Sequence, residues 1–217
     1  MFLGKKNDAY VEKAEKYCRD HFDTVQAHLG EWQEAFPEAA WTWRGDYIIS
    51  YLSRWVVPEP LLHAASHAAI NFHPASPDYP GIGCTNFALY HSASEYGVTC
   101  HHMATKVDTG KIIATLRFPI LPNDTVESLL HRTYEHQLVL FYNVMDCLAH
   151  EMPLPESTEN WTRTPFTRDE FNRLCEITPE LTATEIQKRI RATMFGSWRP
   201  RINLHGFIFE LKGAAGD

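Results

Sequence analysis

Short apolar stretches alternate with helical stretches along the first half of the chain, and this alternation constrains the fold most. Strands are expected at residues 1–4, 22–27, 46–52 and 68–71, and the first intervening helix ends near Asp20. Strands joined through helices pair in parallel with right-handed crossovers. The pattern therefore predicts an α/β fold with a Rossmann-like, mostly parallel sheet flanked by helices.

The second half predicts two more strands, at residues 97–103 and 111–118, and a long helix over about 125–151. The Pro-containing stretch 152–157 marks a boundary between a domain over 1–151 and a C-terminal segment over 156–217. That segment is expected to hold two short helices with capping boxes, beginning after Thr167 and Thr182, and a hairpin turning at His205-Gly206. In the long helix, apolar residues recur at three- and four-residue steps and predict a stripe with a packing role only, formed by Val126, Leu129, Leu130, Tyr134, Leu138, Phe141, Met145 and Leu148.

Composition excludes several classes of protein. The 217 residues are 44% hydrophobic and carry a formal net charge of −7, which predicts a globular chain without a nucleic-acid partner.

No apolar run reaches the roughly 18 residues of a membrane helix, so no membrane insertion is expected. No GxGxxG follows the first strand, so a dinucleotide is not expected. Scattered cysteines without CxxC spacing predict a cytoplasmic protein with reduced thiols and no metal site: Cys18, Cys84, Cys100, Cys147 and Cys175.

The stretch NFHPASPDYPGIG (71–83) follows directly on an apolar strand and holds the first candidate site. Asn71 and His73 are two residues apart, so in a strand they face the same side. The prolines after them give the departing chain a fixed path. The pair could be a buried polar pair that satisfies loop carbonyls. It could also be catalytic, because strand ends of open α/β sheets bind ligands and histidine exchanges protons near neutral pH.

Asp108 lies in the tight connection between the fifth and sixth strands, on the same predicted sheet as Asn71 and His73. A single carboxylate in such a loop is ordinarily just solvated. The combination of an amide, an imidazole and a carboxylate on one sheet instead favours a catalytic group.

At this point the chain resembles the 10-formyltetrahydrofolate-dependent formyltransferases, over roughly residues 46–118. The resemblance rests on four motifs, namely Asn71-x-His73-Pro74, Pro77-x-Tyr79-x-Gly81, Gly97-Val98-Thr99 and Asp108-x-Gly110. It implies that Asn71, His73 and Asp108 are the catalytic residues and that 10-formyltetrahydrofolate is the co-substrate. The family's folate site carries over to a strand end and a loop, with contacts expected at Ser53, Arg54, Trp55, Val57, Met103, Ala104, Thr105 and Val107; Trp55 could equally be core.

The implied chemistry suits these side chains. Formyl transfer to an amine passes through a tetrahedral oxyanion, to which the Asn71 amide can donate a hydrogen bond. His73 can donate to the same oxygen or take the proton of the attacking amine, and Asp108 can orient His73 and help to relay that proton. The acid–base assignment stays open at this level.

Three branches of the family are candidates for the acceptor. Methionyl-tRNA formyltransferases carry a larger, basic C-terminal domain, whereas residues 156–217 hold nine basic and nine acidic side chains. Glycinamide ribonucleotide formyltransferases have a Gly/Ser/Asn-rich phosphate loop where this chain has Gly4-Lys5-Lys6-Asn7-Asp8. Residues 79–90 and 198–206 instead look like the nucleotide-sugar N-formyltransferases, especially those that act on GDP-perosamine for surface polysaccharide (O-antigen). A folate- or nucleotide-binding protein without catalysis is the alternative from another class.

Contacts to the nucleotide sugar are predicted at both ends of the chain. The residues proposed are Lys5, Lys6, Tyr79, Gly81, Trp198, Arg199 and Arg201. For the lysines the alternative is a solvated pair, and for the arginines it is packing of the hairpin. A two-stranded hairpin is marginal alone in water, so it must pack on its own core or on a second subunit, and we favour a homodimer.

Overall fold

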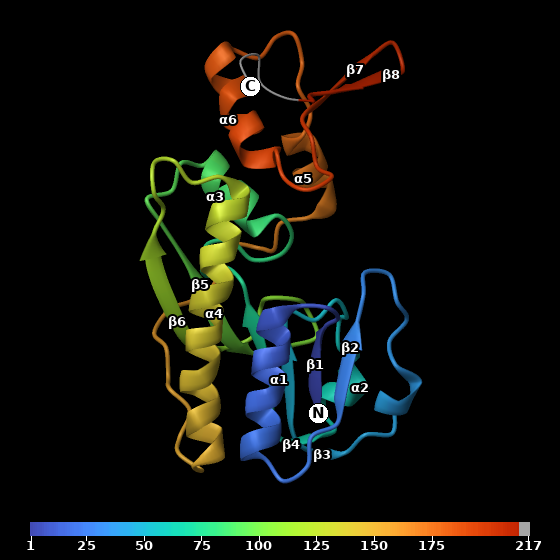
Figure 1. The fold of residues 1–217 in the computed structure, drawn as a ribbon, viewed down its shortest axis with the longest axis vertical. Coiled ribbons are helices and arrows are strands. Elements are labelled where there is room, and N and C mark those ends of the chain that lie inside the picture. Colours follow the sequence, from blue (N-terminus) through green and yellow to red (C-terminus); the bar gives the residue numbers. More distant parts are fainter. Residues whose placement is uncertain (213–217) are drawn as a thin grey trace.

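The computed structural model describes residues 1–212, and a six-stranded sheet with the strand order β2-β1-β3-β4-β5-β6 forms its centre (Figure 1). Along the chain, the elements up to the linker are β1 (Phe2–Lys5), α1 (Ala9–His21), β2 (Ala27–Gly30), η1 (Glu38–Ala40), β3 (Gly45–Tyr51), α2 (Glu59–Leu62), β4 (Ala65–His73), α3 (Cys84–Tyr90), β5 (Glu95–His102), β6 (Ile112–Pro119) and α4 (Val126–Ala149).

The first four strands pair in parallel, whereas β5 is antiparallel to both β4 and β6. Only a short loop joins β5 to β6, and neighbouring strands linked so briefly must run in opposite directions. The predicted α/β fold with a mostly parallel sheet is confirmed.

The second strand was predicted in the wrong place. Residues 22–27 look like a strand, but β2 begins at Ala27, where it pairs with Phe2. Phe22 instead ends α1, because its N–H donates to the carbonyl of Cys18. The residues between them return the chain from the end of α1 to the sheet, and only from Ala27 onward can it pair in register with β1.

Apolar side chains cover both faces of the sheet. Phe2 and Ile49 face a large core that also contains apolar residues of α1 and α4, which lie side by side in Figure 1. Leu3 and Ile48, their neighbours along the strands, face a smaller core with η1 and α2. Neighbouring residues face opposite cores because side chains in a strand alternate with a two-residue period. Since apolar side chains cover both faces of the sheet, polar groups gather at the ends of the strands.

The C-terminal segment contains α5 (Arg168–Leu174), α6 (Ala183–Thr193) and the hairpin of β7 (Arg201–Leu204) and β8 (Phe207–Glu210). Figure 1 shows these elements together at one end of the molecule, with the hairpin projecting. Thr167 and Glu170 form the predicted capping box, whereas at Thr182 only the side-chain half is present. The hairpin turns at His205 and Gly206, as predicted, with φ values of 53° and 88°. Among residues 1–212, no helix combines the length and apolar character needed to cross a membrane.

Candidate active site

A cavity of about 570 Å³ lies where β1, β3 and β4 end. In open α/β sheets, ligands bind outside these carboxyl ends. The cavity wall includes all three predicted catalytic residues, Asn71, His73 and Asp108. The topology therefore brings together residues that are up to 37 positions apart in the sequence.

Asp108 is the centre of the polar group. Its carboxylate lies 3.3 Å from Nδ1 of His73 and 3.5 Å from Nε2 of His101, and it accepts a hydrogen bond of 2.8 Å from the backbone N–H of Gly81. Asp108 is itself buried, and its backbone is left-handed (φ 49°), a conformation that aspartate tolerates better than most residues. Burial acts to raise the pKa of its carboxyl, but His73, His101 and the Gly81 N–H together lower it to about 2.

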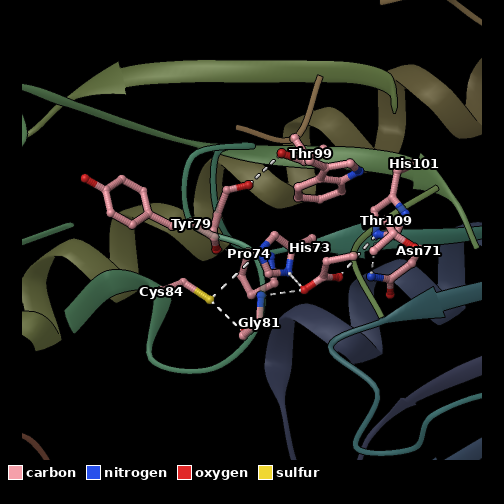
Figure 2. Close-up of polar contacts among 12 residues, drawn as sticks. Asn71, His73, Pro74, Tyr79, Gly81, Cys84, Thr99, His101 and Thr109 are labelled. Atoms are coloured by element: carbon pink, nitrogen blue, oxygen red, sulfur yellow. Dashed lines mark hydrogen bonds and ion pairs between the residues drawn. The ribbon is translucent and has the colours of Figure 1, made fainter. Parts of the chain in front are cut away.

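His73 has an oxygen acceptor at each ring nitrogen. Nδ1 faces Asp108, and Nε2 lies 3.0 Å from the backbone carbonyl of Tyr79 (Figure 2). A neutral imidazole can donate only one hydrogen bond, so it satisfies one of these two acceptors at a time. In this arrangement His73 is a donor, poised beside an ionised carboxylate.

Asn71 contacts His101, which lies opposite it in the antiparallel β4–β5 pair. Nδ2 of Asn71 is 3.1 Å from Nε2 of His101, while Nδ1 of His101 is 2.8 Å from the backbone carbonyl of His102. The carbonyl acceptor at Nδ1 places a proton on that nitrogen, whereas Nε2 faces both the Asn71 amide and the Asp108 carboxylate, which is 3.5 Å away. An amide has two N–H bonds, so the second is available to a ligand in the cavity.

Gly81 is required by the path of the loop that follows His73. Its φ is +91°, and a Cβ atom there would lie 2.4 Å from the backbone oxygen of Phe166. Cys84 closes the same turn, since its thiol donates to the Gly81 carbonyl at 3.1 Å. Burial raises the pKa of that thiol well above its usual value, so Cys84 is a neutral packing group rather than a nucleophile.

Seven of the eight predicted folate contacts line the cavity; they are Ser53, Arg54, Trp55, Val57, Met103, Ala104 and Val107. Thr105 is exposed and lies outside the wall. Trp55 combines both of its predicted alternatives, because it lines the cavity and also packs its ring against Gly30. Its indole N–H donates to the carbonyl of Glu34 at 2.9 Å.

The predicted nucleotide-sugar contacts are divided between two places. Lys5 and Gly81 line the cavity. Lys6 instead binds the carboxylate of Glu34, at 2.7 and 2.9 Å. The Tyr79 side chain is buried outside the wall, and Figure 2 shows its phenol pointing away from His73.

The three C-terminal candidates surround a second, smaller cavity of about 160 Å³. Trp198, Arg199 and Arg201 all line it. The guanidinium of Arg199 donates to the backbone carbonyls of Gly196 and Trp198, at 2.7 and 2.6 Å. Arg201 lies 3.7 Å from Glu176. The structure therefore does not bring these residues to the catalytic group.

Other cavity residues were not predicted as contacts from the sequence, among them His101, Arg168 and Tyr134, whereas Lys106 lies within the loop expected to contact the folate. Tyr134 corrects the packing-only interpretation of the α4 stripe, because it is only partly buried and lines the cavity. The sequence places His101 on a predicted strand. Its contact with Asn71, however, depends on the register of the antiparallel β4–β5 pair. That register is not visible in either segment alone.

A formyl transferase family model matches residues 11–145 of the chain. This match covers more than half of the sequence, so the chain belongs to the formyl transferase family, and the prediction of an enzyme is confirmed.

Solved structures share the fold. A sugar N-formyltransferase from a Shewanella species aligns with a TM-score of 0.76 at 16% identity, over 97% of this chain and 95% of that one. An N-formyltransferase from Helicobacter canadensis, in complex with folinic acid and dTDP-3-aminofucose, aligns at 0.71 and 22% identity over 89% and 80%. The methionyl-tRNA formyltransferase from Clostridium thermocellum aligns at 0.68 and 17% over 96% and 89%.

Proposed function

We propose that this chain is a sugar N-formyltransferase, which moves the formyl group of 10-formyltetrahydrofolate onto the amino group of a nucleotide-linked amino-dideoxysugar. The observation that carries the proposal is the charge of the cavity wall. In a chain of net charge −7, the described residues of the wall include Lys5, Arg54, Lys106 and Arg168 but only one acidic side chain, Asp108. Two anionic ligands, a folate with its glutamate and a nucleotide diphosphate, match such a wall.

Three of these cations are free to bind ligands. Within residues 1–212, the side chains of Arg54, Lys106 and Arg168 have neither an ion pair nor a hydrogen bond, whereas Lys5 is 3.0 Å from Asp8. We assign Arg54 and Lys106 to the folate, because they lie in the two segments that supply the predicted folate contacts. Arg168 comes from the C-terminal segment and is assigned to the nucleotide.

In the proposed reaction, the nitrogen of the sugar amine attacks the formyl carbon, and the carbonyl oxygen becomes an oxyanion. The free N–H of Asn71 donates to that oxygen, and Nε2–H of His73 does so after it leaves the Tyr79 carbonyl. The bond from the formyl carbon to N10 of the folate then breaks, and N10 takes up a proton as the amine loses one. Asp108, ionised because its pKa is about 2, holds His73 in its orientation.

The sugar and its nucleotide are part of the same proposal. The likeness of residues 79–90 and 198–206 to enzymes acting on GDP-perosamine supports that substrate, and hence a role in O-antigen synthesis. The Helicobacter canadensis structure holds a dTDP-linked 3-amino sugar, so dTDP-linked sugars are the competing acceptors. A cytoplasmic location is supported by the five free thiols.

We further propose a homodimer that buries the β7–β8 hairpin. Its apolar side chains are strongly exposed, with 71% of Phe207, 62% of Ile208 and 58% of Phe209 accessible to solvent. A surface of this kind is typical of an interface.

The test is an acceptor panel of GDP- and dTDP-linked 3- and 4-amino sugars, with glycinamide ribonucleotide and methionyl-tRNA included. The release of tetrahydrofolate is followed by absorbance. We expect turnover with at least one nucleotide sugar, and GDP-perosamine should be the best. Turnover with only glycinamide ribonucleotide or methionyl-tRNA would overturn the proposal, and turnover with no acceptor would favour the non-catalytic binding protein.

A further inference from the structure

The segment between α4 and α5 runs back along β6 and contacts the catalytic group with a side chain that does not line the cavity. Residues 156–166 are called the strap here. Its carboxylate Glu159 binds the Arg117 guanidinium of β6, with Nε 3.1 Å from Oε2, and also accepts a hydrogen bond from Thr115. The same Arg117 lies 3.0 Å from Asp78, in the loop that follows His73. One guanidinium therefore ties the strap to the catalytic loop.

Backbone hydrogen bonds extend this connection. The N–H of Thr162 donates to Pro77 at 3.3 Å, and the N–H of Phe166 donates to Pro80 at 2.9 Å. In return, the N–H of Ile82 donates to Phe166 at 3.0 Å. The loop held in this way contains the two backbone groups that contact the catalytic side chains, namely the Tyr79 carbonyl on His73 and the Gly81 N–H on Asp108.

Trp161 lies at the centre of the strap, against the imidazoles of His73 and His101. Its ring is edge-on to His101, with centroids 5.1 Å apart, and edge-on to His73, with centroids 5.7 Å apart. Its indole N–H donates to the carbonyl of Gly110 at 2.8 Å. Gly110 ends the turn that carries Asp108, and a Cβ atom there would lie 1.8 Å from the carbonyl of His102.

Trp161 is not among the described residues that line the cavity. It therefore supports the reacting groups without facing a substrate. Edge-on aromatic contacts fix ring orientation as well as burying area, and small displacements of catalytic groups have large effects on rate.

The geometry points to the strap as a positioning element for the formyl transfer proposed above, in which Trp161 holds His73, His101 and the Asp108 turn in their working arrangement. The domain over 1–151 is accordingly incomplete as a catalyst without residues beyond its boundary.

Amide hydrogen exchange of Trp161→Leu tests this inference without any substrate. We expect the Gly81 amide to exchange about tenfold faster than in the unchanged protein, while core amides of α1 and α4 keep their protection. Trp161→Phe retains the ring edge but loses the N–H, and it should fall between the two. Trp41→Leu removes an exposed tryptophan outside the cavity wall and should change nothing.

Activity provides the second measurement. Trp161→Leu should lower kcat about 10- to 100-fold with KM nearly constant, and should alter the pH profile of kcat. If Trp161→Leu does not fold, Glu159→Ala, which releases the strap from Arg117, should give the same changes to a smaller degree. Unchanged Gly81 exchange in the folded variants, or a uniform loss of protection throughout the chain, would overturn the inference. If the unchanged protein transfers no formyl group, the proposed function fails, while the exchange result still decides the role of the strap.

Discussion

The catalytic group at the end of β4 and the cavity beside the C-terminal hairpin both contain residues that the sequence predicts as site residues, but these residues differ in what they contact. In the first, Asp108 contacts His73 directly and Asn71 through His101, and all of them line a 570 Å³ cavity. In the second, the Arg199 guanidinium donates its hydrogen bonds to the backbone carbonyls of Gly196 and Trp198. Residue type therefore indicates a candidate, whereas the groups left free to bind decide whether it is a site.

The largest effect on turnover is expected from substitutions in the catalytic group. Asn71→Ala and His73→Ala should each lower turnover by at least about 100-fold, because an oxyanion donor in a comparable site contributes 10²–10³ in rate. Steady-state kinetics with both substrates measures the loss. His67→Ala is the matched control, since this histidine is also on β4 but is exposed and lies 3.3 Å from Asp46. Near-normal turnover in either first variant would remove the proposed site.

Asp108 should matter for both rate and stability. Asp108→Asn is expected to lower turnover about 10- to 100-fold and to change its pH dependence, because the group that orients His73 loses its charge. Kinetics over a pH series measures this, with the exposed Asp46→Asn as control. An unchanged profile would make Asp108 purely structural.

Acid should weaken the fold through the same carboxyl. The pKa of Asp108 in the folded protein, about 2, lies below its ordinary value of 3.8, so its ionised form stabilises the fold above about pH 4. The contribution, on the order of 2 kcal/mol, is lost as the pH falls toward 2. Denaturant unfolding at several pH values should show this loss in the unchanged protein. If Asp108→Asn loses stability over this pH range to the same extent, Asp108 is not its cause.

Arginine variants can show which of the two cavities binds the nucleotide. Arg168→Ala should raise the KM for the nucleotide sugar about tenfold and leave that for the folate nearly constant, the mark of lost ground-state binding. Arg199→Ala and Arg201→Ala, predicted from the sequence to do the same, should change this KM less than twofold, because Arg199 donates to backbone carbonyls and Arg201 lies beside Glu176. The reverse order would move the nucleotide to the C-terminal cavity.

The smallest effect on catalysis is expected from the hairpin. Phe207→Ser should shift the protein from dimer to monomer, measured by sedimentation, while kcat changes less than about twofold, because the hairpin is remote from the catalytic contacts. Lys188→Ala, at an exposed position on α6, is a control for surface changes nearby. A monomer in the unchanged protein would refute the dimer directly.

How far the sequence predicts this molecule depends on the range of the interactions involved. The placement of Asn71 and His73 on one strand follows from a two-residue period, and the hairpin turn follows from His205-Gly206; both are local. The start of β2 depends on pairing with Phe2, and the contact of Asn71 with His101 depends on strand register.

The same limit applies around the site. The stripe on α4 identifies buried residues, but periodicity cannot tell that Tyr134 faces a cavity instead of a core. Trp161 and Arg168 follow the predicted boundary at 152–157, and only the return of the strap along β6 brings them near the catalytic group.

The most direct test of the central claim follows the formyl carbon itself. 10-Formyltetrahydrofolate labelled with ¹³C in the formyl group is incubated with the chain and GDP-perosamine, and with the dTDP-linked amino sugars, and the sugar products are analysed by mass spectrometry. The account predicts that the label appears on the sugar amine with the unchanged protein and is reduced at least about 100-fold with His73→Ala. Label on the sugar at equal rates in both proteins, or label that never leaves the folate, would contradict it.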